Sequence, residues 1–270
     1  MDYNIEYVKG HGTKNDFVII EDLEDNLDIS LNQVKEICDR NSGIGADGIL
    51  RVVKNNNQFF MDYRNADGSL AEMCGNGARV FGLYLKERNL VNEDTFTIST
   101  RAGDVKITVI NPNEISVTMN TAKIRNNPVE IKNNSRTYSA TGVDAPNPHA
   151  VVFVDDLSEI GDLKVPPIHL PSEEFTHGVN VEFVKKISDT HGQMRVFERG
   201  SGETLSCGTG ACAVATVLRK LSNNQQDQFQ IDVKGGTLII NFVGDKIIMT
   251  GPAVLESSGI LKDNWYSIKK

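Results

Sequence analysis

This sequence of 270 residues lacks several features that would place it in a specialised class. It has no apolar run long enough to span a bilayer. Its first ten residues, M-D-Y-N-I-E-Y-V-K-G, lack the basic start and the apolar core that are typical of a signal peptide. No Gly-x-x-x-x-Gly-Lys-Ser/Thr phosphate-binding loop occurs. These absences predict a cytoplasmic protein without a membrane segment.

The sequence also lacks an excess of positive charge, since its formal net charge is −8 at pH 7. That balance disfavours a nucleic-acid or membrane surface as partner. It does not disfavour a small charged metabolite, which single arginines and local dipoles can bind. The hydrophobic content of 39% and the charged content of 24% are typical of a globular protein. The length fits one large domain or two of ordinary size.

Cysteine is scarce, and the four cysteines do not form paired C-x-x-C motifs. A zinc module is therefore not expected, and the sequence assigns no metal ligand. In a reducing compartment all four should be free thiols. Cys38 falls on the apolar side of a helix expected from Leu31, with Ser30 as its N-cap. Cys38 and Cys212 are interpreted as buried small hydrophobes.

The two remaining cysteines share one motif, M-C-G-N-G-A-R-V at Cys74 and S-C-G-T-G-A-C-A at Cys207. Close to half of the chain separates them. Each precedes a segment that is apolar on most sides, which predicts buried helices that end near Arg88 and Leu221. Strand-like segments precede and follow each helix, so the repeat predicts an α/β (α+β) fold of two similar lobes. The polar, Asn-rich segment 120–136 is the expected boundary between them.

A cysteine followed by Gly-x-Gly at a helix start suggests a specific chemistry. The first N–H groups of a helix are unpaired and carry a partial positive charge, and glycines let a ligand approach them closely. Such a site suits a carboxylate, and its field favours the thiolate form of a nearby thiol. Two such sites could invert the α-carbon of an amino acid, with one thiolate as base and one thiol as acid. No electron-sink cofactor is then required.

The sequence closely resembles the diaminopimelate epimerases. The motifs that carry the resemblance extend from residue 10 to residue 253: G-T-K-N-D-F, G-I-G-A-D-G, Y-R-N-A-D-G-S-x-A-E-M-C-G-N-G-A-R, N-P-H, G-V-N-V-E-F-V, F-E-R-G-x-G-E-T-L-S-C-G-T-G-A-C-A and G-P-A. The resemblance implies isomerase activity without cofactor or metal, on LL- and meso-diaminopimelate, in lysine and peptidoglycan precursor biosynthesis. It also implies a homodimer.

The resemblance implies a fold as well: two pseudo-symmetric lobes, each a β-barrel-like sheet wrapped around a central helix. The N-terminal lobe would comprise residues 1–119 and a returning tail of about 256–270, and the C-terminal lobe residues 120–255. The active site is expected in the cleft between the lobes.

Site residues follow by motif. Cys74 and Cys207 are implied as the acid–base pair, supported by Glu198 and His149. The implied substrate-binding residues are Asn15, Asn65, Gly75, Asn76, Asn147, Asn180, Glu198, Arg199, Gly208 and Thr209.

Each of these residues also has a simpler interpretation. Gly75, Asn76, Gly208 and Thr209 could form mere capping turns, and asparagines in N-A-D-G and N-P-H are typical turn-formers. Glu198 and Arg199 are neighbours on a predicted strand, so they should point to opposite faces and could be a solvated surface. Otherwise Arg199 would hold a carboxylate and Glu198 an ammonium group. His149 alone resembles an ordinary loop histidine, although its pKa range would let it tune a thiol.

Two positions depart from the family pattern. Many members carry glutamine where this chain has Gly48, and histidine where it has Asn41. Both changes concern recognition of the far end of the substrate.

Three other functions remain open from the sequence. The chain could be a related racemase of the proline or histidine type. It could be a thiol redox protein that uses a Cys74–Cys207 disulfide, a bond that could also inactivate an epimerase. It could also be a non-catalytic binding protein, which would tolerate loss of Cys74.

Overall fold

The computed structural model of the chain describes residues 5–223 and 225–269. Its contacts divide the chain into two units. One, the N-terminal lobe, consists of Met1–Val117 and Gly251–Lys270, and the other, the C-terminal lobe, of Thr118–Thr250. Residues 1–4, 224 and 270, which the predicted lobe ranges include, lie outside the described residues.

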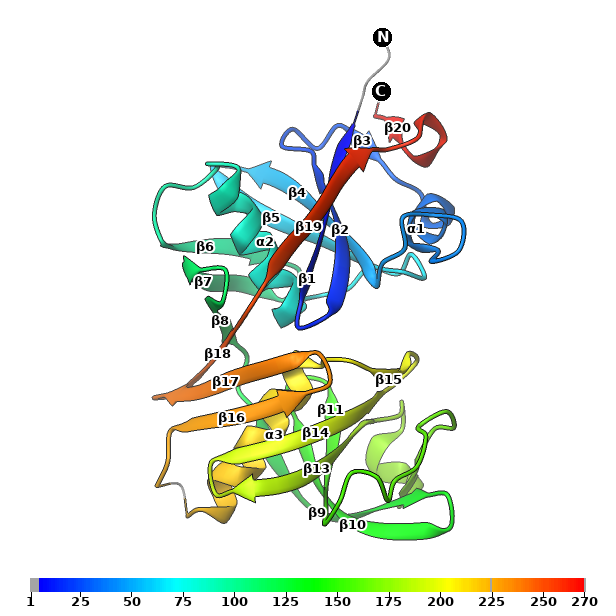
Figure 1. Cartoon of the computed structure of the whole chain (residues 1–270), viewed down its shortest axis with the longest axis vertical. Coiled ribbons are helices and arrows are strands. Elements are labelled where there is room, and N and C mark those ends of the chain that lie inside the picture. Colours follow the sequence, from blue (N-terminus) through cyan, green and yellow to red (C-terminus); the bar gives the residue numbers. More distant parts are fainter. Residues whose placement is uncertain (1–4, 224, 270) are drawn as a thin grey trace. The chain divides into compact units, whose positions relative to one another are not determined.

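The N-terminal lobe is a strongly bent sheet around one helix, α2 (Gly75–Glu87), as Figure 1 shows. Strands β2 and β4 pair in parallel, as do β5 and β6, and the other pairs of the lobe are antiparallel. Helix α2 contacts β1, β2, β4, β5, β7 and β19. The strands are β1 (Glu6–Gly12), β2 (Asn15–Glu21), β4 (Gly48–Asn55), β5 (Gln58–Asn65), β6 (Thr95–Thr100), β7 (Gly103–Asn111), β8 (Glu114–Met119) and β19 (Val254–Ile260).

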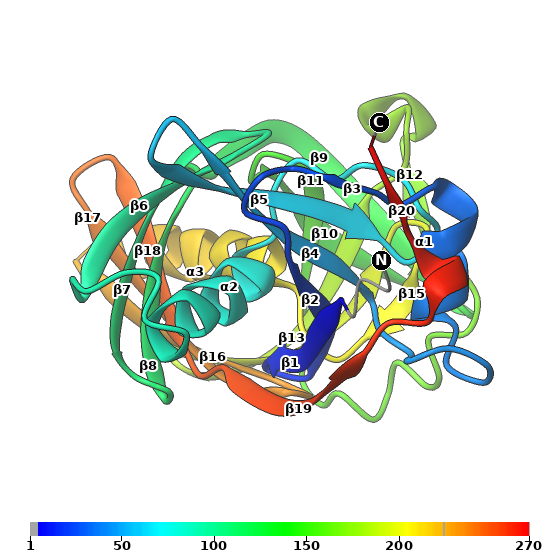
Figure 2. The same ribbon diagram turned by 90° about the horizontal axis from the view of Figure 1, so that it is seen from above.

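A second layer of the N-terminal lobe joins early and late parts of the chain. Helix α1 (Leu31–Cys38) begins at Ser30, which forms a capping box with Gln33 and confirms the predicted N-cap. Strand β3 (Leu27–Asp28) pairs with β20 (Ser267–Ile268), beside α1 in Figure 2. The 3₁₀ helix η2 (Asp263–Trp265) packs against α1 and places Trp265 in the same apolar cluster as Val34 and Ile37.

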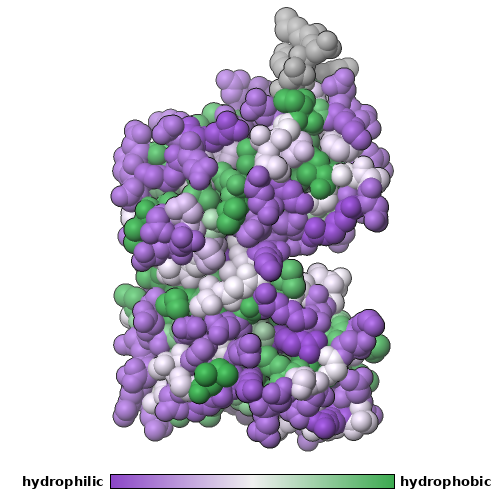
Figure 3. All heavy atoms as spheres, viewed as in Figure 1, coloured by the Kyte–Doolittle hydropathy of each residue, from purple (hydrophilic) through white to green (hydrophobic). Residues whose placement is uncertain are grey.

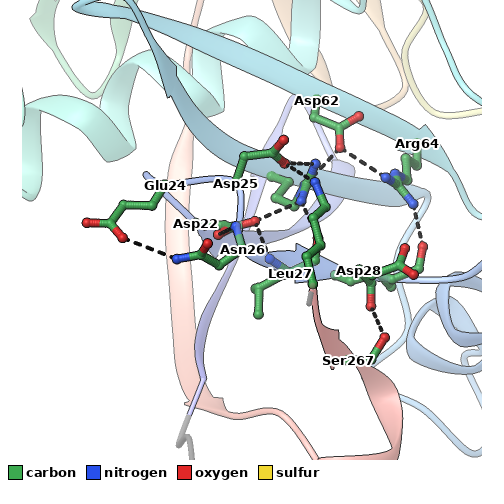
Figure 4. Close-up of polar contacts among 12 residues, drawn as sticks. Asp22, Glu24, Asp25, Asn26, Leu27, Asp28, Asp62, Arg64 and Ser267 are labelled. Atoms are coloured by element: carbon green, nitrogen blue, oxygen red, sulfur yellow. Dashed lines mark hydrogen bonds and ion pairs between the residues drawn. The ribbon is translucent and has the colours of Figure 1, made fainter.

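A buried ionic cluster lies behind this layer. The Asp62 carboxylate, only 2% exposed, pairs with Arg51 at 2.9 Å, with Arg64 at 3.2 Å and with Arg101. Arg51 also reaches Asp22 at 2.7 Å. Figure 4 shows Asp62 and Arg64 on β5, facing the Asp22 loop. Burial alone would raise the pKa of Asp62, but the hydrogen bond from Arg101 and the charges of Arg64 and Arg51 hold it below its ordinary value.

The C-terminal lobe is a second bent sheet around α3 (Gly208–Leu221), which contacts β9, β10, β11, β13, β14, β16 and β17. Its strands are β9 (Lys123–Asn133), β10 (Arg136–Asp144), β11 (Pro148–Val154), β12 (Ile168–Leu170), β13 (Asn180–Ser188), β14 (His191–Glu198), β15 (Gly202–Thr204), β16 (Gln228–Val233), β17 (Gly236–Val243) and β18 (Lys246–Gly251). A 3₁₀ helix, η1 (Ser172–Phe175), follows β12.

The strand order of the two lobes is the same around their helices. In the first, β1–β2 is antiparallel, β2–β4 parallel, β4–β5 antiparallel and β5–β6 parallel. In the second, β10–β11, β11–β13, β13–β14 and β14–β16 repeat that sequence of directions. The predicted fold of two similar lobes, each built around one buried helix, is thus confirmed.

The segment expected as the lobe boundary, 120–136, lies within the C-terminal lobe, and most of it is strand β9. Among the described residues, no helix is long and apolar enough to cross a membrane. On the face drawn in Figure 3, hydrophilic residues prevail on both lobes and hydrophobic ones occur in small scattered groups.

Candidate active site

Cys74 is the N-cap residue of α2. Its sulfur accepts a hydrogen bond from Gly77 N at 3.4 Å, and its thiol donates to Asn15 Oδ1 at 3.6 Å. Gly75 and Asn76 form the first turn of the helix and are buried. The side chain is partly exposed, so a ligand can reach it. The predicted position of this cysteine at the start of a buried helix is confirmed.

Asn15 links this helix start to a network of charges. Its amide nitrogen donates to Asp47 Oδ2 at 2.7 Å, and its oxygen accepts from Asn76 Nδ2 at 3.3 Å. Arg40 pairs with Asp47 at 2.8 Å and with Asp16 at 2.6 Å. The sequence analysis did not single out Asp47 or Arg40, although both lie in or beside the G-I-G-A-D-G motif. They give Asn15 a fixed orientation, with its oxygen toward the thiol.

The remaining predicted residues of this lobe lie at strand ends. Asn65 ends β5, and its amide donates to Ser69 Oγ at 3.0 Å, as the turn interpretation expects. Gly48 begins β4, where a β-carbon would lie 2.4 Å from the carbonyl oxygen of Arg64. Glutamine therefore does not fit at this position without a shift of β5. Asn41 is exposed, and its backbone N–H donates to Asp39.

Cys207 is the N-cap residue of α3, in the position that Cys74 has on α2. Its sulfur accepts from Gly210 N at 3.4 Å and lies 3.5 Å from Thr209 Oγ1. It is 5% exposed. Burial raises the pKa of this thiol well above its ordinary value, and the charges of Glu198 and Glu182 raise it further. The surroundings of Cys207 thus favour the thiol form, whereas the helix start alone was expected to favour the thiolate.

Glu198 and Arg199 are not neighbours on a strand as expected, because β14 ends at Glu198 and Arg199 lies in the turn that follows. Glu198 ends β14, is partly buried and accepts a hydrogen bond from Thr204 Oγ1. Burial raises its pKa. Arg199 is exposed, and its guanidinium donates to the backbone oxygen of His177 at 2.8 Å.

His149 is fully buried, contrary to the loop-histidine interpretation. Its Nδ1 lies 2.7 Å from Glu182 Oε1, and its Nε2 lies 3.0 Å from Asn147 Oδ1. Asn180 has internal partners on both ends of its amide: Nδ2 donates to Pro148 O at 3.2 Å, and Oδ1 accepts from Arg199 N at 2.9 Å.

Glu182 is the main site residue that the sequence analysis missed. It is 0% exposed on β13, between the apolar residues Val181 and Phe183. The motif G-V-N-V-E-F-V could have indicated its role. A glutamate in a buried strand requires a polar partner, because an unpaired buried carboxylate is strongly destabilising.

Each lobe thus assembles its own set of residues. Asn15, Gly75 and Asn76 surround Cys74. Thr209, Glu198 and Glu182 lie around Cys207, and His149 contacts Glu182. Action of both sets on one substrate stays a prediction. All four cysteines are free, and among the described residues no group of His, Cys, Asp and Glu could hold a metal ion.

Cys38 and Cys212 are buried, as predicted. Burial, followed by the charges of Asp16 and Asp47, raises the pKa of Cys38 to about 12. Cys38 is therefore a poor nucleophile.

Comparison with known sequences identifies relatives over nearly the whole chain. A family model described as diaminopimelate epimerase matches residues 7–125 and 141–256. The diaminopimelate epimerase of Streptomyces coelicolor is 44% identical over 98% of this chain and 98% of its own length. That of Corynebacterium glutamicum strain R is 39% identical over 96% of this chain and 99% of its own.

Comparison with solved structures shows the same fold at low sequence identity. A phenazine biosynthesis protein of Bacillus anthracis matches with a TM-score of 0.70 at 15% identity, over 96% of this chain and 99% of that one. A hydroxyproline epimerase of Agrobacterium vitis, with bound trans-4-hydroxy-L-proline, matches with a TM-score of 0.69 at 13% identity, over 97% and 94%.

Proposed function

Because this chain belongs to the diaminopimelate epimerase family, we propose that it interconverts LL- and meso-diaminopimelate, with Cys74 and Cys207 as its two acid–base groups. One observation carries the assignment of the pair. Each sulfur caps the first turn of a lobe's central helix, at the same place in a repeated strand order. A structural cysteine would not need that position twice.

The reaction is a proton transfer at the α-carbon. A thiolate removes the α-hydrogen from one face, and a thiol returns a proton to the other, so each thiol ends in the state in which the other began. The N–H groups at the two helix starts stabilise the negative charge that the substrate carboxylate gains as the carbanion forms. Gly75, Asn76, Gly208 and Thr209 supply those first turns.

The polar residues around each sulfur hold the substrate in this proposal. Asn15 and Asn147 present amides, Glu198 receives an ammonium group, and Arg199 holds a carboxylate. Asn180 acts indirectly, since its amide holds the backbone of Pro148 and Arg199 in place. Asn65 fixes the turn before the first cysteine.

The same proposal includes the setting of the enzyme. Free thiols require a reducing compartment such as the cytoplasm, and oxidation to a Cys74–Cys207 disulfide would inactivate the enzyme reversibly. We also propose a homodimer, which sedimentation analysis of the reduced protein tests directly. A monomer at micromolar concentration would contradict the proposed homodimer but not the proposed reaction.

Proton NMR of LL-diaminopimelate in D₂O tests the reaction. With reductant, and without pyridoxal phosphate or metal, the wild-type protein should remove the α-proton signal and produce the meso isomer. Cys74→Ala and Cys207→Ala should each lower the rate by at least about 10³-fold, because neither half-reaction can finish without both groups. Cys38→Ala, which removes a buried thiol outside both helix starts, is the matched control and should keep the rate. Absence of exchange by folded, reduced wild-type protein contradicts the proposal.

A further inference from the structure

The two cysteine motifs occupy equivalent positions in their lobes, but the side chains packed behind them differ. In the N-terminal lobe, Phe17 on β2 lies opposite the first residue of β4, and the third residue of β4 is Leu50. In the C-terminal lobe, His149 on β11 lies opposite the first residue of β13, and the third residue of β13 is Glu182. The repeat therefore equates the apolar pair Phe17/Leu50 with the polar pair His149/Glu182.

The apolar pair lies directly behind the first helix start. Phe17 and Leu50 are both 0% exposed. A β-carbon built on Gly77 would lie 3.4 Å from each of these side chains and 3.5 Å from the β-carbon of Cys74. The side chains at this place behind the cysteine loop are thus apolar in the N-terminal lobe.

The polar pair takes the same place behind the second helix start. His149 and Glu182 are also 0% exposed. A β-carbon on Gly210 would lie 2.7 Å from Glu182 Oε1 and 3.3 Å from the sulfur of Cys207. Since the other lobe fills this space with phenylalanine and leucine, packing does not require an imidazole and a carboxylate here.

The polar pair also destabilises the folded protein. The second carboxylate oxygen of Glu182, Oε2, is buried and has no hydrogen-bond partner within the described part of the chain. A buried acceptor without a partner destabilises the folded state. A pair that is dispensable for packing and costly in stability is best explained by a role in the site.

The hydrogen bonds of His149 define that role. An amide oxygen can only accept, so His149 Nε2, 3.0 Å from Asn147 Oδ1, carries a hydrogen and donates it. Nδ1 shares a second proton with Glu182 Oε1 across 2.7 Å. With its oxygen thus occupied, Asn147, which is partly exposed, has its NH₂ group left for a ligand.

We propose that Glu182 is a positioning residue for the Cys207 half of the site: through His149 it fixes the Asn147 amide so that its NH₂ group donates to a carboxylate of the substrate. This inference rests on the proposed function and deepens it. It also explains why the two half-sites differ. Around Cys74, Asp47 orients the Asn15 amide. Around Cys207, the chain of contacts Glu182–His149–Asn147, here called the relay, orients the Asn147 amide.

A double-mutant cycle tests the relay. Glu182→Leu and His149→Phe copy the apolar pair of the other lobe, singly and together. Each single variant should raise the KM for diaminopimelate at least about tenfold, the effect of losing one charged hydrogen bond. The KM of the double variant should be no higher than that of His149→Phe, because in this proposal Glu182 reaches Asn147 only through His149. An unchanged KM in folded Glu182→Leu, or independent effects that multiply in the double variant, would overturn the proposal.

The control comes from a second histidine–carboxylate pair in the same lobe. His191 Nε2 lies 2.7 Å from Asp232 Oδ2, the same distance as in the buried pair. Asp232→Asn should leave kcat and KM unchanged. A change as large as that of Glu182→Leu would show that loss of any such pair in this lobe has the effect, and would overturn the specific role of Glu182.

A measurement on the wild-type protein keeps the test independent of folding and of activity. In ¹⁵N-histidine NMR, the signals that are missing in His149→Phe identify His149. Its Nε2 should be protonated, and a bare Nε2 would overturn the relay. This result stands whether or not the protein turns over diaminopimelate, whereas absence of α-proton exchange in the wild type refutes the proposed function alone.

Discussion

At the scale of single residues, Gly210 is a position at which one added methyl group should disturb the surroundings of Cys207. A methyl group there would overlap Glu182 Oε1 and press on the sulfur of Cys207. Gly210→Ala should therefore destabilise the protein by about 1–3 kcal/mol, as overpacking of a core does, although alanine favours a helix. Its rate of α-proton exchange should fall as well. Urea denaturation and the D₂O assay measure the two effects.

Gly77 provides the matched control, because it has the same place on α2. A methyl group there would meet its nearest neighbours, Leu50 and Phe17, at 3.4 Å. Gly77→Ala should therefore lose less than about 1 kcal/mol, with part of the strain offset by helix propensity. If both variants lost the same stability, the close approach of Glu182 to Gly210 would not be the cause.

Much of the candidate site was predictable at this scale. Cys74 and Cys207 lie at the helix starts that their glycines predicted. Glu182 was not predicted, because its role depends on which residue faces it across β11 and β13, and that register is a tertiary feature. The Asn180 amide likewise has its partners far along the chain, at Pro148 and Arg199.

At the scale of elements, the capping box of α1 supports a prediction. Ser30 Oγ accepts from Gln33 N at 3.4 Å, and Gln33 Oε1 accepts from Ser30 N at 2.8 Å. Ser30→Ala should lower the free energy of unfolding by about 0.5–2 kcal/mol. It should also raise hydrogen exchange selectively in α1 and in η2, which packs on it. Ser257→Ala, an exposed change on β19, should do neither.

Helices were easier to predict than strands. All three α-helices follow from capping residues and apolar spacing, which act locally. The segment 120–136 contains many asparagines, and its polarity suggested a boundary. It instead forms β9, which pairs with β10 through a turn at Asn134, a residue with φ of 54°. Pairing with a neighbouring strand overrides the low strand propensity of asparagine.

At the scale of the whole molecule, the return of the chain to its first lobe was implied only by family resemblance. Strand β19 pairs with β1, so that Glu6 lies opposite Ile260. No local pattern specifies a pairing over such a separation, because it depends on the complete sheet. The buried ion pairs of Asp62 could not be predicted locally either, because they join β4, β5 and the turn after β6.

The Asp62 cluster predicts how the N-terminal lobe responds to acid. The folded pKa of Asp62 is depressed, so its stabilising contribution is complete above the unfolded value of about 3.9 and is lost as the pH falls through the folded value. Each unit of difference between the two values contributes about 1.4 kcal/mol. Asp62→Asn should therefore be less stable than the wild type at pH 7, but its free energy of unfolding should fall less steeply below pH 4.

Urea denaturation across this pH range, followed by fluorescence, measures the difference. The single tryptophan, Trp265, is buried in the N-terminal lobe and reports on it. Asp104→Asn, which changes an exposed carboxylate on β7, serves as control and should keep the wild-type slope. If Asp62→Asn had the wild-type slope too, the acid sensitivity of this lobe would come from other carboxylates. Asp16 would then be the first to test. Burial alone would raise its pKa, but the hydrogen bonds and charges of Arg40 and Lys9 lower it below its ordinary value.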